Sequence, residues 1–256
     1  LLSEFLSPDI NNRNDAWGGD IENRARIHIE IIKRCREEVG EDFPISVKMN
    51  SADFQKGGFA ADDSIIVAKM LENAGVDIIE ISGGTYEQPK LIGVDDLTIN
   101  PERSEQRKES TIAREAYFLE YAKDIRKAVS LPLMVTGGFR TKEGIEDALQ
   151  SNICQIIGIG RPLCVDPYCI KKMIEGELEI LPSFEKTLSL GPSILSPSSP
   201  FTIIKAVNAF GAMAWFYQQI KNMAKGLMPN HKQKLLNALR ADMKADKLAL
   251  KDYLNH

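Results

Sequence analysis

The sequence predicts an α/β fold built from parallel strands, and three observations support this. Short apolar segments alternate with longer amphipathic ones, as in successive βαβ units. Glycines follow the apolar segments closely, where a strand would turn into the next loop. The length of 256 residues, with 43% hydrophobic and 27% charged residues, is that of a globular chain with a sizeable core.

Four helices are predicted from apolar residues that recur at helical spacing. In the first of them, Ile27, Ile31 and Ile32 follow this spacing, and Gly40 provides the stop. The predicted helices are 22–39, 62–71, 111–128 and 142–150. The predicted strands are the apolar runs at 44–49, 76–82, 131–136 and 154–159. Four strands by themselves leave open whether the sheet is an open one or part of a barrel.

A change in composition marks off the C-terminal part of the chain. Residues 189–200 are rich in serine and proline and are the predicted linker. Two helices are expected beyond it, at 201–227 and 231–253. The predicted domains are therefore an α/β body over 1–188, the linker, and a helical extension from 201 to the end. We expect these two helices to pack onto the body, although a helix on a membrane surface is the alternative.

The charge balance argues against a nucleic-acid partner. The chain has 32 basic and 36 acidic residues, a net charge of −4, so no large positive field is available to attract a phosphate backbone. No run of about 18 apolar residues occurs, so no transmembrane segment is expected. The first residues lack the basic start and apolar centre of a signal peptide, and the expected location is the cytoplasm.

The four cysteines do not form a recognisable framework. None belongs to a CxxC pair, and only three histidines are present. This spacing argues against a disulfide scaffold and against a structural zinc site. No metal site is therefore expected, and the thiols are interpreted as ordinary reduced side chains.

Glycine-bearing loops follow the third and fourth predicted strands. Gly137 and Gly138 follow the third, and Gly160 and Arg161 follow the fourth. Glycine lets the backbone approach a ligand closely, and N–H groups at the start of a helix favour an anion. In (β/α)₈ barrels the loops after the last two strands form a recurrent phosphate site. Two such loops with an arginine favour a phosphate site over glycines that merely end strands.

Lys48 lies within the first predicted strand, between Val47 and Met49. A buried ammonium group needs a partner, because burial without one costs several kcal/mol, about 2–7 for a polar group and more for a charge. Two interpretations remain open from the residues alone: a carboxylate in the core, or an anion at the mouth of a barrel.

The N-terminal segment is the most specific one in the chain. Its motifs are Phe5-Leu6-Ser7-Pro8, Asn11-Asn12-Arg13-Asn14-Asp15, Trp17-Gly18-Gly19 and Ile21-Glu22-Asn23-Arg24-Ala25-Arg26. Together they resemble the Old Yellow Enzyme family of FMN-dependent ene-reductases, and the detail is similar to fungal members. Asn14 and Asp20 depart from the family pattern, where Thr and Ser or Thr are usual. The segments at 135–139 and 158–167 match the ends of the family's last two strands, so the resemblance runs from residue 1 to about 185.

The resemblance implies the second half of a TIM (β/α)₈ barrel that binds FMN and takes hydride from NADH or NADPH. The implied substrate is a small α,β-unsaturated molecule, reduced at its C=C bond. Lys48 falls where the family places a cation at the N1–O2 edge of the flavin. Gly137 and Gly138 match the first phosphate-binding loop, and Gly160 and Arg161 match the second. Asn23, Arg24 and Arg26 are expected to be structural, joining a helix to the loop before it.

In the family, a His with a His or Asn three positions after it anchors the substrate, and a Tyr donates the proton. These residues precede the matched segment, so the resemblance assigns no catalytic residue in this chain. The chain is then expected to be part of a larger flavoenzyme, a truncated product, or a half-barrel that completes its sheet by self-association. Two other classes stay open. A phosphate-handling lyase or isomerase shares the glycine loops, and for it Lys48 is a candidate Schiff-base lysine. A catalytically inactive binding or interaction protein is the second.

Overall fold

The computed structural model describes residues 1–52, 57–82 and 119–254, and these divide into two compact units. The first unit is Leu1–Ile159, and the second begins at Gly160. The sequence-based limits, with the body ending at 188, stay a prediction. Gly83 and Gly84, which follow the second predicted strand, and the first eight residues of the predicted helix 111–128 lie outside the described residues.

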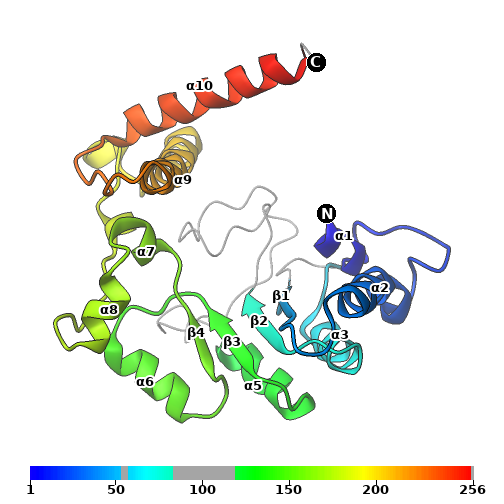
Figure 1. Cartoon of the computed structure of the whole chain (residues 1–256). Coiled ribbons are helices and arrows are strands. Elements are labelled where there is room, and N and C mark those ends of the chain that lie inside the picture. Colours follow the sequence, from blue (N-terminus) through cyan, green and yellow to red (C-terminus); the bar gives the residue numbers. More distant parts are fainter. Residues whose placement is uncertain (53–56, 83–118, 255–256) are drawn as a thin grey trace. The chain divides into compact units, whose positions relative to one another are not determined.

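The first unit contains a four-stranded parallel sheet with the order β1-β2-β3-β4, which confirms the predicted α/β fold (Figure 1). Its strands are β1 (Ser46–Asn50), β2 (Ile78–Ser82), β3 (Leu133–Thr136) and β4 (Ile156–Gly158). Its helices are α1 (Leu2–Leu6), α2 (Ile21–Val39), α3 (Ala61–Asn73), α5 (Leu119–Ala128) and α6 (Lys142–Gln150). All four predicted strands are therefore present, each within a few residues of its expected limits.

One face of this sheet forms the main core. Helices α3, α5 and α6 lie on the same side of the sheet (Figure 1), and α3 packs against both α2 and α5. Side chains alternate between the two faces of a strand. The buried members on the helix side are Met49, Ile79, Ile81, Leu133 and Val135. The other face carries the alternate residues, and there the polar side chains are found.

Arg36 and Asp77 join three segments at the edge of the sheet where the strands begin. The Arg36 guanidinium donates to Gly75 O at 2.7 Å and to Asp77 Oδ2 at 2.6 Å. Asp77 Oδ2 also accepts from the Ile45 amide at 2.7 Å. The amide of Ile45, and next the side chain of Arg36, hold the pKa of Asp77 below its ordinary value. The pair thus fixes the start of β1 against the start of β2.

We expect Asp77→Ala to lower the free energy of unfolding by about 1 kcal/mol at pH 7, because two hydrogen bonds are lost. A carboxyl group with a lowered folded-state pKa stabilises the fold above its unfolded-state pKa, about 3.9. That contribution disappears as pH falls through the folded-state value. The difference between variant and wild type should therefore shrink below about pH 4, as measured by urea unfolding at pH 7 and pH 3. A difference that is constant between these two pH values would contradict this.

The second unit is helical, with a small core of its own. It contains α7 (Arg161–Val165), α8 (Cys169–Ile174), two 3₁₀ turns η3 (Phe184–Lys186) and η4 (Ser193–Leu195), α9 (Thr202–Ala224) and α10 (Leu235–Leu254). The two long helices are those that the sequence predicts. Trp215 of α9 is fully buried with Val165 and Ala238, and Phe184 packs beside them. No helix among the described residues is long and apolar enough to cross a membrane.

Helices α9 and α10 approach closely because Gly211 has no side chain. A Cβ atom at this position would lie 2.1 Å from Cδ2 of Leu235. The serine- and proline-rich segment also packs on α9, since Asn208 accepts from the Leu190 amide at 2.9 Å and donates to Leu195 O at 3.0 Å. One asparagine of α9 thus holds the start and the middle of that segment.

Candidate functional site

The C-terminal end of β3 leads into a glycine pair whose backbone favours glycine. Gly137 has φ 137° and Gly138 has φ 84°, values that residues with a side chain rarely adopt. Helix α6 begins at Lys142, and its N-cap Thr141 accepts a hydrogen bond from the Gly144 amide at 3.1 Å. The two glycines therefore form the turn between the strand and a capped helix, and their role in binding a phosphate stays a prediction.

The end of β4 carries two glycines with different structural roles. Gly158 lies opposite Thr136 in the β3–β4 register. Gly160 is the N-cap of α7, and no atom lies within 4 Å of the place where its Cβ would be. Space is therefore open beside the Gly160 backbone, which suits the close approach of a ligand.

Arg161 pairs with a carboxylate of its own unit. Its guanidinium lies 3.8 Å from Glu185 Oε1, and both side chains are largely buried. Nothing in the sequence pattern pointed to Glu185, because it lies 24 residues further along in a short 3₁₀ turn. The predicted role of Arg161 toward a phosphate stays a prediction, and Glu185 is the group with which a phosphate would share it.

Lys48 has a carboxylate partner, as in one of the two alternatives left by the sequence, and its predicted contact with an anion stays a prediction. Its Nζ lies 2.6 Å from Glu80 Oε1, and the two residues are opposite each other in the β1–β2 register. The expectation that this lysine is buried is wrong: its side chain is 55% exposed, against 16% for Glu80. The reason is the strand's alternation, which places Lys48 on the face away from α3 and α5, while Met49 is buried on the other.

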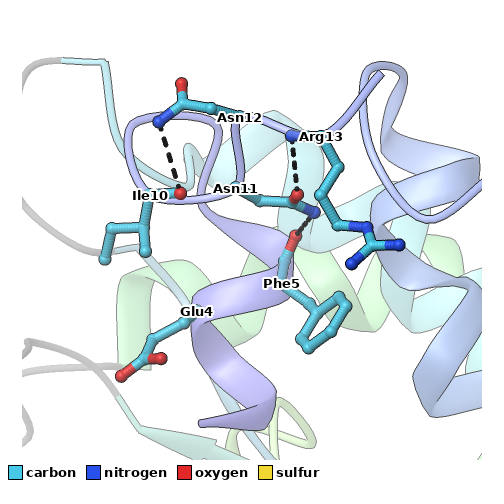
Figure 2. Close-up of a pocket in the computed structure, with 6 residues that line it drawn as sticks. All are labelled: Glu4, Phe5, Ile10, Asn11, Asn12 and Arg13. Carbon is cyan, nitrogen blue, oxygen red and sulfur yellow. Dashed lines mark hydrogen bonds between the residues drawn. The ribbon is translucent and has the colours of Figure 1, made fainter. Parts of the chain in front are cut away.

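The N-terminal signature segment forms a hydrogen-bonded loop (Figure 2). Asn11 donates from Nδ2 to Phe5 O and to Trp17 O, both at 2.8 Å. Asp15 accepts from Arg13 and from the Trp17 amide, and the Arg13 side chain holds the pKa of Asp15 below its usual range. A Cβ atom on Gly18 would lie 2.3 Å from Arg13 O, so glycine is required at that position.

Beside this loop lies a pocket of about 320 Å³. The residues lining it are Glu4, Phe5, Ile10, Asn11, Asn12 and Arg13. Asn11 and Arg13 are engaged within the loop itself, since Asn11 donates to Phe5 O and the Arg13 amide donates to Asn11 Oδ1 (Figure 2). The predicted phosphate glycines and Lys48 do not line the pocket. It is a feature of the signature loop and not of the predicted cofactor site.

The arginines of the signature are structural, as expected. Arg24 is buried and donates from Nη1 to Leu6 O at 2.6 Å and from Nη2 to Asp63 Oδ2 at 3.0 Å. Arg26 donates from Nε to Ala16 O at 2.7 Å. Its Nη2 also donates to Asn23 Oδ1 at 2.7 Å. Helix α2 is thereby joined to the loop before it and to α3.

Known proteins share this fold and this N-terminal signature segment. The model of the NADH:flavin oxidoreductase / NADH oxidase family matches residues 1–179. The chain belongs to this family. The resemblance inferred from the N-terminal motifs and the strand-end glycines is thus confirmed, including its fungal character, since flavin oxidoreductases of fungi are among the relatives.

Among curated relatives of this family member, the NADH-dependent flavin oxidoreductase iliE of Neonectria sp. is 36% identical over 197 residues. That match covers 76% of this chain and 24% of the relative. The NADH-dependent flavin oxidoreductase iccE of Talaromyces variabilis is 34% identical over 230 residues, covering 88% of this chain and 53% of the relative. The chain therefore spans between a quarter and about half of the length of these proteins.

Solved structures agree on the fold of this family member. A 2-naphthoyl-CoA reductase complex matches with a TM-score of 0.58 and 33% identity, over 69% of this chain and 24% of that one. The Old Yellow Enzyme homologue from Zymomonas mobilis matches with a TM-score of 0.51 and 20% identity, over 78% and 50%. The four parallel strands with their helices thus correspond to part of a TIM-barrel enzyme.

Proposed function

We propose that this chain provides the phosphate-binding part of an FMN-dependent NAD(P)H oxidoreductase of the ene-reductase type. The observation that carries the proposal is the family match over residues 1–179, on a parallel sheet whose third and fourth strands lead into glycine loops. The proposed substrate is a small α,β-unsaturated molecule. A further four strands, from another part of the protein or from a second copy, would complete the barrel.

The residues present fit FMN at its polar groups. Gly137 and Gly138 turn the backbone at the end of β3, and the backbone at Gly160 has open space beside it. Oγ1 of Thr136, the last residue of β3, is a buried hydroxyl without a hydrogen-bond partner. Backbone amides and an arginine at such loops are the groups that hold phosphates in barrels of this kind.

When bound, FMN would accept hydride from NADH or NADPH and deliver it to the β-carbon of an activated alkene. The part of this chain is to hold the phosphate through its glycine loops and Arg161, and to supply a cation through Lys48. A fixed positive charge stabilises an anionic group that develops next to it. Glu80, 2.6 Å from Lys48 Nζ, holds the ammonium in place and offsets part of its charge.

The ion pair between Lys48 and Glu80 argues against the lyase alternative. A Schiff-base lysine needs an apolar pocket or a cationic neighbour that favours its neutral amine. Lys48 instead has the Glu80 carboxylate 2.6 Å from its Nζ and a side chain that is 55% exposed, which is not an apolar pocket. Trapping of a carbonyl substrate on Lys48 by borohydride would restore the lyase interpretation.

We expect the purified full chain to keep a yellow flavin absorbance band after incubation with FMN and desalting. Lys48→Met and Arg161→Ala should each weaken FMN binding about 10-fold, because each removes a charged contact of about 1.5 kcal/mol. The matched controls are Lys69→Met and Arg34→Ala, which change exposed charges on α3 and α2. A folded but colourless wild-type chain would contradict the proposal and favour a binding or interaction role.

A further inference from the structure

The hydroxyl group of Thr136 is buried at the C-terminal end of β3 and has no hydrogen-bond partner. A hydroxyl can donate once and accept twice. Burying it unbonded is unfavourable, because its hydrogen bonds to water are lost and not replaced. The group is therefore maintained at a cost to the stability of the ligand-free protein.

The neighbouring strand is adapted to this hydroxyl. Gly158 of β4 pairs with Thr136 in the sheet register. A Cβ atom at residue 158 would lie 1.8 Å from Thr136 Oγ1 and 2.8 Å from Thr136 Cβ. Thr136 thus fills the space that the missing side chain leaves. Glycine within a strand is itself unfavourable, because it has no side chain to pack and loses more conformational freedom on folding.

The position of Thr136 places it on the face of the sheet that carries the polar residues. Val135 is fully buried on the helix-covered face, so Thr136 belongs to the opposite one. Met134 lies on that face too, and its register partner on β2 is Glu80, which pairs in turn with Lys48 on β1. The unbonded hydroxyl and the ion pair therefore share one face, with Thr136 at the strand end that leads into Gly137.

We propose that the Thr136 hydroxyl is a binding group for the ribityl phosphate chain of FMN, through a hydrogen bond to one of its oxygens. The inference rests on the proposed function and adds a side-chain contact to the backbone contacts of Gly137 and Gly138. A hydroxyl oxygen or phosphate oxygen of the ligand would be the hydrogen-bond partner that Thr136 Oγ1 does not have within the protein. The cost of the buried hydroxyl and of Gly158 is then recovered on binding.

The test compares Thr136→Val with Ser7→Ala in the full chain. Valine keeps the shape and strand preference of threonine but removes the hydroxyl. Ser7 is the matched control, because its hydroxyl is also buried and unbonded but lies in the N-terminal segment, after α1. Two quantities are measured: the urea midpoint of the ligand-free proteins, and the dissociation constants of FMN and riboflavin from flavin fluorescence.

We expect neither variant to lower the urea midpoint of the ligand-free protein. Thr136→Val should weaken FMN binding about 10-fold, as the loss of one good hydrogen bond of about 1.4 kcal/mol does, while Ser7→Ala leaves it unchanged. An equal loss for riboflavin would assign the contact to a ribityl oxygen, and a loss for FMN alone would assign it to the phosphate.

Two results would overturn this inference and leave the proposed function unaffected. One is a lower urea midpoint for ligand-free Thr136→Val, which would mean that the hydroxyl serves the fold. The other is unchanged FMN affinity in that variant while the wild-type chain binds FMN. A wild-type chain that binds neither flavin would overturn the proposed function and this inference with it.

Discussion

Replacement of Arg24 by methionine is expected to lower the free energy of unfolding by about 3 kcal/mol, the range for breaking a buried ion pair. The Arg24 side chain is only 7% exposed and joins Leu6 O on α1 to Asp63 on α3. Removal leaves the partly buried Asp63 carboxylate without its cation, and it leaves the Leu6 carbonyl without its donor. The family signature would then lose its link to the core.

Urea unfolding followed by circular dichroism measures this effect. Arg34→Met is the control, because Arg34 is exposed on the same helix and its loss should change the unfolding free energy by less than about 0.5 kcal/mol. The double variant Arg24→Met/Asp63→Asn should be less destabilised than the sum of the two single variants, since it leaves no unpaired charge. If the losses of unfolding free energy in the two single variants simply add in the double variant, Arg24 and Asp63 do not stabilise each other.

Replacement of Trp215 by alanine is expected to cost about 4 kcal/mol, the range for truncating a buried aromatic residue. Trp215 is 0% exposed and forms the centre of the second unit's core with Val165 and Ala238. Its Nε1 donates to Gln233 O at 2.9 Å, and its ring stacks at 5.8 Å from Phe184. Alanine would leave a cavity at the centre of this core.

Hydrogen exchange measures where the effect is felt. Amides of α9 and α10 should lose protection in Trp215→Ala, while those of β1–β4 keep it, because the two compact units have separate cores. Trp215→Phe is the matched variant: it keeps an aromatic ring, loses the bond to Gln233 and part of the buried ring volume, and should cost about half as much. Loss of protection in both units would show that they unfold together.

Helix and strand positions were largely predictable from local patterns. The helix at 22–39 was recognised from apolar spacing and from Gly40, and α2 spans Ile21–Val39. The four strands were recognised as apolar runs close to glycines, and all four form in parallel order. These features depend on residues close together in the chain, so a single sequence contains the information.

The partners of the candidate site residues were not predictable in this way. Lys48 and Glu80 are 32 positions apart, and Arg161 pairs with Glu185 in a turn that no pattern marks. A shift of one residue in the pairing of β1 with β2 would move either side chain to the other face of the sheet. Whether Lys48 meets Glu80 therefore depends on the register of β1 with β2, which only the packed sheet defines.

The sequence by itself determined the α/β class, the parallel direction of the strands and the family. Motifs and periodicity, from which these were inferred, are local properties of the chain. The tertiary structure decided that Lys48 has a carboxylate partner, that Arg24 pairs with Asp63 of α3, and that Thr136 takes the space left by Gly158. Each of these depends on atoms brought within a few ångströms by packing between distant segments. Such contacts exist only in the folded chain. The Thr136 hydroxyl, which is proposed to bind the flavin, was therefore identified from the structure and not from the sequence.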